Sequence, residues 1–473
     1  MRSTAFKKKL YRYRPVPESI PCQASKVRIE SVPSDPRSLE RGVRQCLADK
    51  VAGNLVGLWL LVPELLRLGV WDLLCGWTGR RGEYVEPRLG LQLVHEAALC
   101  VTGIRARRTL GQCGFELANG LPFLASDMAV HELLGAHTVA EAQGLQVALG
   151  KLRRASGHFR GNALAVDPHR IRSYTKRQMR RRRKDPDAPA TKVAQTFFLL
   201  DADTRQPVCF TTGTAARTAT TAAVQLLDLA ADILGPERAL VLVDTEHFTT
   251  ELLDDVKRRA RFDLLVPMPA RQSLIRQLRA LPPETFQPRW AGYATAQRAY
   301  SPHNSTNGPF HQYIQRSGER AEDYHFKVFV STRDGDEVAA LAEEFPKRWH
   351  VEEFYNAEQA LGWDRAGTCN LNIRYGQMSL ALIAQAAIHQ LRKRVGLSAQ
   401  GWDAEHLAKS YFSGLEGDVR VVDGDTIQVT YYNARDAGLL EQTYADMPRR
   451  LRAEGTDPHI PWLYGFQLDF RFR

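Results

Sequence analysis

The sequence predicts an α/β protein, in which a mixed sheet is flanked by helices and accompanied by a β-rich insertion and a helical N-terminal domain. Three observations predict this fold class. Residues 37–155 repeat apolar side chains at intervals of three and four, which is the period of an amphipathic helix. From residue 163 onward, short apolar runs of strand type alternate with helical segments. Residues 270–340 are rich in Pro, Gly, Thr and aromatic residues, as expected for a β insertion.

The length and the composition indicate a folded, multidomain protein. At 473 residues the chain is too long for one hydrophobic core of ordinary size. A hydrophobic content of 44% is enough to build buried cores, which argues against a disordered protein. Lys and Arg outnumber Asp and Glu by 64 to 53, for a formal net charge of +11. This positive balance attracts polyanions, so nucleic acid is the first partner to consider.

The cysteines and the apolar segments argue against a disulfide-rich, secreted or membrane protein. The seven cysteines contain no Cys-x-x-Cys pair, so we expect buried, reduced thiols rather than a disulfide framework or a zinc knuckle. The N-terminus is basic but has no apolar core of a signal peptide. The most apolar window, residues 55–66, is too short to span a bilayer. We therefore expect a cytoplasmic protein with no membrane partner.

The N-terminal third is expected to contain two parts. Residues 1–36 carry a cluster of Lys and Arg followed by five prolines, and we interpret them as a basic arm. Residues 37–155 are predicted to form a helical domain that contributes to DNA binding. Its helical periodicity is clearest in 51–74, 91–101 and 145–152.

The central region, 156–395, is predicted to alternate strands and helices. Residues 163–166 are predicted to form an apolar strand, and we expect a loop to begin at Asp167-Pro168, because a proline disfavours helical backbone in the residue before it and favours an extended or turn conformation. A polar connection after residue 200 is typical of a hairpin. The further predicted strands are 194–200, 208–212, 239–243, 264–267 and, within the insertion of about 270–340, 324–331; the predicted helices are 218–234, 249–259, 346–361 and 378–395. A C-terminal segment, 396–473, is predicted to hold short strands at 419–422, 426–432 and 465–472.

Two aspartates follow apolar strands of the predicted sheet. Asp167 and Asp244 each come directly after such a run, and both should lie at the edge where open α/β sheets place their sites. Carboxylates are the hard oxygen ligands that Mg²⁺ prefers. Two such ions, about 3.5–4 Å apart, can activate the attacking oxygen and stabilise the leaving oxygen in phosphodiester cleavage. The alternative is that each aspartate caps a helix or stabilises a turn.

A third acidic candidate lies on a predicted helix. Arg348, Glu352 and Gln359 are spaced four and seven residues apart, so they share one helical face. The alternative for Arg348 and Glu352 is a surface salt bridge. Competing carboxylates are Glu353, which points about 100° away around the helix, Asp201 and Asp203 in the expected hairpin turn, and Glu246. Among these, Asp201 is the second candidate for the first aspartate.

A basic run follows the first aspartate. Residues 170–184 hold nine Lys or Arg side chains and no acidic one. Their position and sign predict contacts with a DNA backbone beside the site, and a solvated basic loop is the alternative. The candidate DNA-binding residues of this run are Arg170, Arg172, Lys176, Arg177, Arg180, Arg181, Arg182, Arg183 and Lys184.

The order Asp, Asp, Glu resembles the insertion-sequence transposases of the family numbered four. In that family, Tyr, Arg, Glu and Lys follow one another at steps of three, four and seven, on a ribonuclease H-like core with a β insertion ahead of the glutamate. The corresponding residues here are Phe345, Arg348, Glu352 and Gln359, so two positions match and two depart. The resemblance covers roughly residues 160–395, and its most specific part is the segment Arg348-Trp-His-Val-Glu352.

The resemblance implies a fold and an activity. It implies a DDE transposase with a ribonuclease H-like catalytic domain, which cleaves DNA and transfers strands at the ends of an insertion sequence. Asp167, Asp244 and Glu352 would be the catalytic residues and the ligands of two Mg²⁺ ions, for which Mn²⁺ could substitute. Arg348 would contact a DNA phosphate, and Gln359 would replace the lysine of the family at another. The implied partners are double-stranded DNA with terminal inverted repeats and, in the synaptic complex, a second copy of the chain.

Two other functions remain as alternatives. The absence of the Tyr and Lys of the family signature favours a catalytically silent, transposase-derived DNA-binding protein. The segment from His389 to Arg392, with Tyr431 or Tyr432 downstream, loosely resembles a tyrosine recombinase, which we favour less. The histidines His247, His350 and His389 lack the spacing of metal ligands and are expected to be ordinary polar residues.

Overall fold

The computed structural model describes most of the chain. The described residues are 35–48, 51–53, 55–101, 110, 114–176, 178–183, 187–235, 238–364, 368, 370–396 and 401–473. The arm expected over residues 1–36 lies almost wholly outside this set, as do Arg177 and Lys184 of the basic run.

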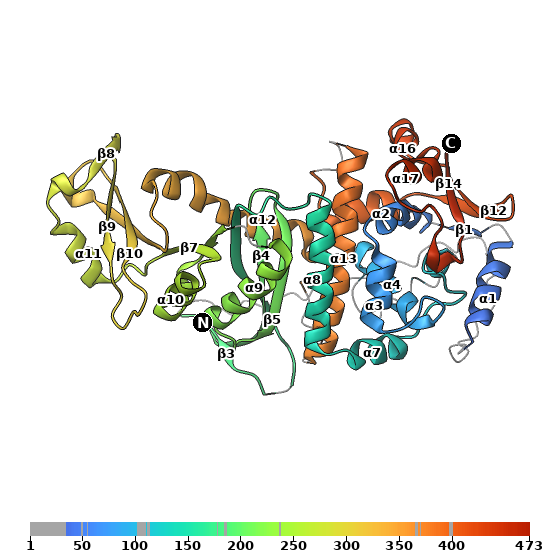
Figure 1. Ribbon diagram of the computed structural model, residues 1–473, viewed down its shortest axis with the longest axis horizontal. Coiled ribbons are helices and arrows are strands. Elements are labelled where there is room, and N and C mark those ends of the chain that lie inside the picture. Colours follow the sequence, from blue (N-terminus) through green and yellow to red (C-terminus); the bar gives the residue numbers. More distant parts are fainter. Residues whose placement is uncertain are drawn as a thin grey trace, which may run out of the picture.

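Within the described residues, ten strands form one mixed sheet (Figure 1). Its order is β3-β4-β2-β6-β7-β11-β10-β9-β8, with β5 paired to β4. Strands β2, β6 and β7 are parallel to one another, whereas β4 is antiparallel to both β2 and β5. The strands are β2 (Ala163–Arg172), β3 (Arg181–Arg182), β4 (Thr191–Asp201), β5 (Gln206–Thr214), β6 (Ala239–Val243), β7 (Phe262–Pro267), β8 (Gln287–Trp290), β9 (Tyr293–Tyr300), β10 (Phe310–Ser317) and β11 (His325–Ser331). The prediction of a mixed sheet with helices packed on it is confirmed.

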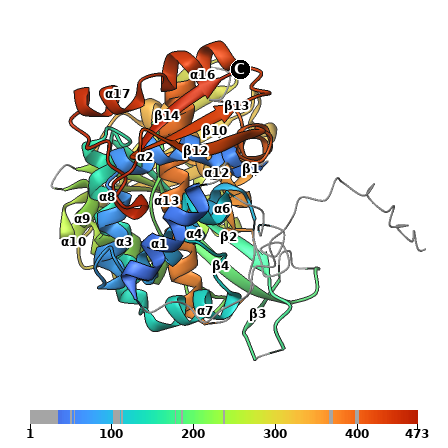
Figure 2. The ribbon, with the colours of Figure 1, turned by 90° about the vertical axis from the view of Figure 1, so that its right-hand side faces the viewer.

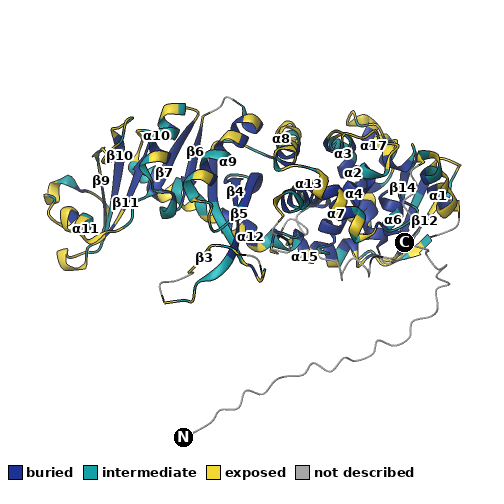
Figure 3. Cartoon of the chain, turned by 90° about the horizontal axis from the view of Figure 1, so that it is seen from below, coloured by how far each residue is buried: buried dark blue, intermediate teal, exposed yellow. Residues whose placement is uncertain are grey.

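Alternating side chains divide the core of the sheet between its two faces. In β2, Leu164 and Val166 join the helices α9 (Ala219–Leu234) and α10 (Thr250–Arg259) in one buried cluster. Ala163 and Ala165 face the opposite way and join a larger cluster with helices of the other half of the molecule. This two-residue period is that of a strand buried on both faces. The strands β4, β5 and β6 of the same sheet are largely buried in Figure 3.

The helices around the sheet begin and end where local signals predict. Thr218 accepts a hydrogen bond from Thr221 N at the start of α9, and the helix ends before Gly235, which has a φ of +77°. Helix α8 (Val139–Ala155) opens with a capping box in which Thr138 and Glu141 bond each other's backbone N–H. The predicted helices 218–234 and 249–259 are therefore confirmed.

The insertion after β7 contains more than strands. Strands β8 to β11 form its antiparallel part, at one end of the molecule in Figure 1. A helix that was not predicted, α11 (Gln272–Arg279), packs Leu278 onto this sheet with Phe286 and Phe326. Its apolar residues recur at helical spacing, but the Pro and Gly content of the surrounding segment hides that pattern.

The N-terminal helices and the C-terminal segment share one buried core. It contains residues of both regions together with the long helix α13 (Leu371–Val395). The N-terminal helices are α1 (Pro36–Ala48), α2 (Val62–Arg67), α3 (Val70–Thr78), α4 (Val85–Ala98), α6 (Phe115–Ala118), α7 (Asp127–Ala136) and α8; the C-terminal elements include α15 (Ala404–Leu407), β12 (Gly417–Val422), β13 (Thr426–Tyr431), α16 (Ala437–Tyr444), α17 (Met447–Ala453) and β14 (Gln467–Phe472). Figure 2 shows these two regions intermingled. The domain boundaries at residues 155 and 395 stay predictions.

One short segment of the predicted helical region is a strand. Residues Val51–Gly53 form β1, which pairs with β12 and so opens a second sheet of order β1-β12-β13-β14 among the described residues. The expectation of a helix from residue 51 is wrong at this end, because a partner from the far end of the chain supplies the backbone hydrogen bonds that make it a strand.

Thiols and membrane spans also bear on the sequence expectations. Cys75, Cys100 and Cys209 are free thiols, in agreement with the prediction. The expected burial holds for Cys209, whereas Cys75 and Cys100 are partly buried and Cys46 is exposed. The other three cysteines lie outside the described residues. Among the helices of the described ranges, none has the length and apolarity needed to cross a bilayer.

Candidate carboxylate site at the strand ends

The parallel register places Asp167 and Asp244 side by side. Val166 of β2 is the partner of Val243 of β6, and each aspartate follows its valine directly. Neighbouring strands lie about 4.7–4.9 Å apart. Asp244 also accepts a hydrogen bond from Thr245 N at 2.7 Å and caps a short 3-10 helix over Thr245–His247. The capping interpretation therefore holds for Asp244 and is compatible with a further role for its second oxygen.

The loop predicted to begin at Asp167-Pro168 is absent from this described segment, because β2 continues to Arg172. The prediction is wrong for a physical reason. Pairing with β6 stops at Val166, so β2 has only β4 as its neighbour from Asp167 onward. Proline has no N–H to donate, and a strand accepts it where one side of the ladder is open. The basic run therefore starts on a strand.

Glu352 reaches the same region from helix α12 (His350–Glu358), which follows a 3-10 turn over Phe345–Trp349. The guanidinium of Arg348 connects it to the sheet. One nitrogen, Nη1, lies 3.7 Å from Asp167 Oδ1, and the other, Nη2, lies 3.3 Å from Glu352 Oε1. The side chains of Arg348 and Asp167 are only 13% and 17% exposed. The pair is therefore more than a surface salt bridge, because it joins two distant parts of the chain.

The pKa of Asp167 is shifted by burial and by the acidic groups close to it. Burial is the largest influence on this carboxyl, and together with the charges of Asp244, Glu352 and Glu246 it raises the pKa to about 7. Arg348 acts in the opposite direction. Like charges that share a site oppose ionisation, and a cation beside them favours it. The site is thus acidic, partly desolvated and short of positive charge.

The carboxylates of Asp167, Asp244 and Glu352 are suitable ligands for a hard divalent cation. In this structure the guanidinium of Arg348 lies between two of them, Asp167 and Glu352. Among the described residues, no group of three or more His, Cys, Asp or Glu side chains is arranged to hold a metal ion. The guanidinium between Asp167 and Glu352 explains this spacing, since it stands in for a cation and occupies the space between the two carboxylates. Carboxylate oxygens in this number are ligands of the type Mg²⁺ takes.

Tyr355 connects the helix to the first aspartate. Its hydroxyl donates a hydrogen bond to the backbone carbonyl of Asp167 at 2.8 Å, and it lies 3.4 Å from the carbonyl of Thr196. The ring is buried and stacks on His169, with 4.4 Å between ring centroids. Tyr355 is three residues after Glu352 in α12. Its hydrogen bond to Asp167 therefore helps to fix the distance between Glu352 and β2. Sequence reasoning missed this residue, and nothing in its local pattern distinguishes it from a core tyrosine.

The turn between β4 and β5 holds the other side of α12. Lys347 Nζ lies 2.7 Å from Asp203 Oδ1, and His350 Nδ1 lies 2.7 Å from the carbonyl of Ala202. Arg205 forms an ion pair with Glu353 at 3.0 Å. The competing carboxylates Asp203 and Glu353 are therefore engaged in fixing the helix to the turn.

Asp201 organises this turn. It is fully buried, and its two oxygens accept hydrogen bonds from four backbone N–H groups, those of Arg160, Gly161, Asp203 and Thr204, at 2.7–3.1 Å. In the β2–β4 register Asp201 is opposite Leu164, whereas Asp167 is opposite Phe198. Asp201 thus lies three positions along the strand from Asp167, with its hydrogen-bonding capacity used locally.

Glu246 connects the site to the basic run. Its carboxylate accepts hydrogen bonds from Arg170 at 2.6 and 2.7 Å and from Arg182 at 2.8 Å. Burial acts to raise the pKa of Glu246, but the hydrogen bonds and charges of Arg170 and Arg182 outweigh it and lower that pKa. Two arginines of the run are therefore held beside Asp244.

The rest of the described basic run is open to solvent on an arm that extends from the sheet around β3 (Figure 2). Arg172 lies over the ring of Tyr174, with 5.2 Å from its guanidinium carbon to the ring centroid. The exposed members are Arg172, Lys176, Arg180, Arg181, Arg182 and Arg183. An exposed cationic arm is compatible with both a DNA contact and a solvated loop.

The two departures from the family signature have different surroundings. Phe345 packs on Phe329, with ring centroids 4.7 Å apart, and lies 6.0 Å from the guanidinium carbon of Arg348. Gln359 lies just beyond α12, which ends at Glu358, and starts a 3-10 turn that closes at Gly362 with a φ of +112°. The expectation that one regular α-helix carries Gln359 two turns beyond Glu352 is therefore wrong by a residue at its end, because the backbone tightens there to form a turn.

The three histidines show no ligand arrangement among the described residues. His247 is fully buried, and burial lowers its pKa to about 4. His350 bonds the β4–β5 turn, and His389 packs edge-on against His158. The interpretation of His350 and His389 as ordinary polar residues agrees with these contacts. For His247, whose ring nitrogens have no hydrogen-bond partner among the described residues, it stays a prediction.

Comparison with known proteins found a family match for the central region of the chain. The structure gives an α/β protein that gathers acidic side chains where the parallel pairing of β2 with β6 ends. Residues 158–386 match the family model described as the transposase DDE domain. No curated protein matches the chain significantly. Among solved structures, the chain is similar to the piggyBac transposase in a cryo-EM structure of its synaptic complex with hairpin DNA, with 12% sequence identity, a TM-score of 0.35, and 85% of this chain and 84% of that chain covered.

Proposed function

We propose that this protein is a DDE transposase that cleaves DNA and transfers the cut strands at the ends of an insertion sequence. The observation that carries the proposal is the convergence of Asp167, Asp244 and Glu352 from two neighbouring strands and one helix, with Arg348 between Asp167 and Glu352. The transposase DDE family match spans all three residues, which supports the same assignment.

The topology supports a ribonuclease H-like core and membership of the family numbered four as parts of this proposal. The order β5-β4-β2-β6-β7 has a central parallel strand with antiparallel neighbours on one side and parallel neighbours on the other. The antiparallel insertion β8 to β11 lies between β7 and α12, ahead of Glu352. The resemblance noted in the sequence places its β insertion at the same point.

In the proposed active site, Asp167, Asp244 and Glu352 hold two divalent metal ions, Mg²⁺ with Mn²⁺ as a substitute. When bound, such ions activate the attacking oxygen and stabilise the leaving oxygen of a phosphodiester. The carboxylates need a cation because Asp167 is buried beside three other acidic groups. Arg348 must then turn away from Asp167, and its fork of N–H groups becomes available to a DNA phosphate.

The basic run at residues 170–184 and the pairing of two copies of the chain are the remaining parts of the proposal. Arg170 and Arg182 neutralise Glu246 beside Asp244, and the exposed arginines further along the arm contact the DNA backbone. The substrate is double-stranded DNA with terminal inverted repeats, and two copies of the chain hold the two ends together. Cytoplasmic residence is part of the same proposal.

A second candidate function is a silent DNA-binding protein derived from a transposase. The observations that favour it are the packed phenyl ring of Phe345 and the neutral side chain of Gln359, where the family signature has a phenol and a cation. The tyrosine recombinase alternative has less support, because Tyr431 is fully buried and donates its hydroxyl to the carbonyl of Val56.

The test is metal-dependent nicking of DNA that carries the inverted repeats. Asp167→Asn, Asp244→Asn and Glu352→Gln should each lower nicking by several orders of magnitude and leave DNA binding in place. Glu343→Gln, an exposed change on the segment that precedes α12, is the matched control. Full activity in any of the three variants refutes that residue as a ligand. An inactive wild-type protein that still binds the repeats supports the silent alternative.

A further inference from the structure

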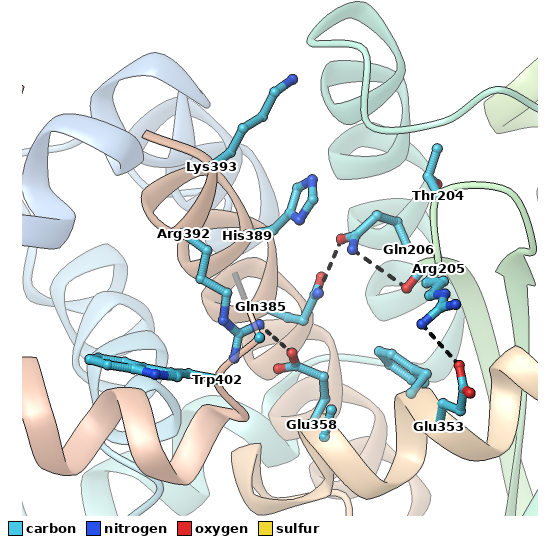
Figure 4. Close-up of a pocket in the computed structure, with 13 residues that line it drawn as sticks. Thr204, Arg205, Gln206, Glu353, Glu358, Gln385, His389, Arg392, Lys393 and Trp402 are labelled. Atoms are coloured by element: carbon cyan, nitrogen blue, oxygen red, sulfur yellow. Dashed lines mark hydrogen bonds and ion pairs between the residues drawn. The ribbon is translucent and has the colours of Figure 1, made fainter. Parts of the chain in front are cut away.

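A cavity of about 530 Å³ lies behind the helix that carries Glu352, and the proposed reaction does not use it (Figure 4). Its walls come from the β4–β5 turn, from α12, from the C-terminal half of α13, and from the residues before α15. This volume is in the range of sites that bind small organic molecules.

The deepest polar groups of the cavity have unused hydrogen-bonding capacity. Arg392 is 7% exposed and pairs through Nη1 with Glu358 Oε1. Its Nε and Nη2, and the second oxygen of Glu358, have no hydrogen-bond partner among the described residues. A buried donor without a partner costs about 1–3 kcal/mol. These donors are therefore suited to a bound acceptor.

The buried charge around the cavity is positive in excess. Arg153 is fully buried and donates to the amide oxygens of Gln206 and Gln385, at 3.0 and 3.1 Å, both of which line the cavity. It forms no ion pair with any residue of the described ranges, so Arg153 and Arg392 share the buried carboxylate of Glu358. An uncompensated buried charge is unfavourable, and an anion in the cavity would relieve it.

The excess of positive charge also affects the pKa values of two nearby histidines, His158 and His389. Burial lowers the pKa of His158 to about 2 and that of His389 to about 3, and in both cases Arg153 and Lys393 act in the same direction. Both imidazoles are therefore neutral at physiological pH. They leave the cationic side chains unbalanced. Of the two, only His389 lines the cavity, because the ring nitrogens of His158 are engaged by Arg153 and Gln390 at 3.2 and 3.3 Å.

The geometry points to a nucleotide site, with the phosphate held by Arg392 and the base against Trp402. An arginine fork matches phosphate oxygens, and an aromatic ring offers a stacking surface for any base. Lys393 is exposed where it lines the cavity, and Trp402 is partly exposed beside His406, with 4.4 Å between ring centroids. The cavity is too large for a bare phosphate alone, which favours a ligand with a base attached.

The cavity lies close to the proposed active site. Arg205, which lines it, pairs with Glu353, the residue directly after Glu352. The nucleotide can come from two sources, either the end of a DNA strand held for cleavage or a free nucleotide. The first source rests on the proposed function, whereas nucleotide binding itself does not.

The first experiment measures binding of deoxyadenosine monophosphate to the full chain by isothermal titration calorimetry. Arg392→Gln should weaken binding by about tenfold, which corresponds to one charge-assisted contact. Glu358→Gln should tighten it several-fold, because the variant removes the buried negative charge beside Arg392; a gain in affinity cannot come from misfolding. Arg449→Gln, an exposed change that does not line the cavity, should leave binding unchanged. No binding by the wild type, or equal affinities in the Arg392 and Glu358 variants, overturns the inference.

The second experiment separates the two sources. A short single-stranded oligonucleotide with a 5′-phosphate, and the same oligonucleotide without it, compete against deoxyadenosine monophosphate. Competition by the oligonucleotides assigns the cavity to a DNA strand, and its absence assigns the cavity to a free nucleotide. If the wild type nicks DNA but does not bind deoxyadenosine monophosphate, this inference fails and the proposed function stands. If it binds deoxyadenosine monophosphate but does not nick DNA, the proposed function fails and this inference stands.

Discussion

Replacing Tyr355 with Phe tests whether one hydroxyl positions the proposed catalytic helix. The group joins α12 to the backbone carbonyl of Asp167 at 2.8 Å, across the gap that separates Asp167 from Glu352. Burial raises the pKa of Tyr355, and the charge of Asp167 acts in the same direction, so the hydroxyl stays protonated and remains a donor. The substitution removes this donor and keeps the ring that packs on Phe198 and His169.

Two magnitudes follow from this contact. A buried intramolecular hydrogen bond contributes about 0.5–1.5 kcal/mol, so the free energy of unfolding should fall by about 1 kcal/mol. A displacement of about 1 Å between reacting groups can lower a rate by roughly 100-fold. We therefore expect nicking by Tyr355→Phe to fall by about 10- to 100-fold, which is more than the small decrease in folded protein explains.

Tyr444→Phe is the matched control for this prediction. Tyr444 is also fully buried, and its hydroxyl donates to the carbonyl of Leu60 at 3.1 Å, in the core of the N- and C-terminal regions. Urea unfolding should give similar decreases in stability for the two variants, while DNA nicking separates them. If Tyr355→Phe nicks DNA at the rate of the wild type, or if both variants lose activity equally, the positioning role is refuted.

Four further predictions concern other contacts. Asp201→Asn should lower the free energy of unfolding by about 3 kcal/mol or more, because an amide nitrogen cannot accept the N–H groups that the carboxylate accepts; a folded variant without metal-dependent nicking would instead move the first ligand to Asp201. Changing Arg180–Arg183 to Ser should reduce the slope of log affinity against log salt by about 0.9 for each DNA phosphate that these arginines neutralise, and an unchanged slope would show that the side chains face solvent. Gln359→Lys should tighten binding to pre-cut DNA ends in a filter-binding assay, because a charge-assisted contact is about twice as strong as a neutral one, and the absence of a gain would show that the turn after α12 does not approach the phosphate. Burial raises the pKa of Glu116 from 4.5 to about 7, so the folded state binds the extra proton and stability should fall as the pH rises through this interval; urea unfolding at pH 5 and pH 8 should show a smaller decrease in Glu116→Gln than in the wild type, because Asp167 contributes in the same interval, and equal decreases would rule out Glu116 as a cause.

The sequence by itself determined the class of fold, most elements of the sheet and the acidic candidates. The strand Ala239–Val243 and the helices near residues 218–234 and 249–259 lie where periodicity and capping residues predict them. These features are local, since a strand period, a threonine cap and a closing glycine act within a few residues. The order of Asp167, Asp244 and Glu352 was readable for the same reason, as each follows or belongs to a strongly patterned segment.

The tertiary structure decided the surroundings of these residues. Whether β2 ends at Pro168 depends on where its partner β6 ends, and whether Val51–Gly53 is a strand depends on β12, which lies near the other end of the chain. The same holds for Arg348, which reaches Asp167 as well as its helical neighbour, and for Asp201, whose oxygens are taken by distant backbone N–H groups. Hydrogen bonds and ion pairs between distant segments depend on how the chain packs in three dimensions, and a linear pattern of residue types does not specify that packing.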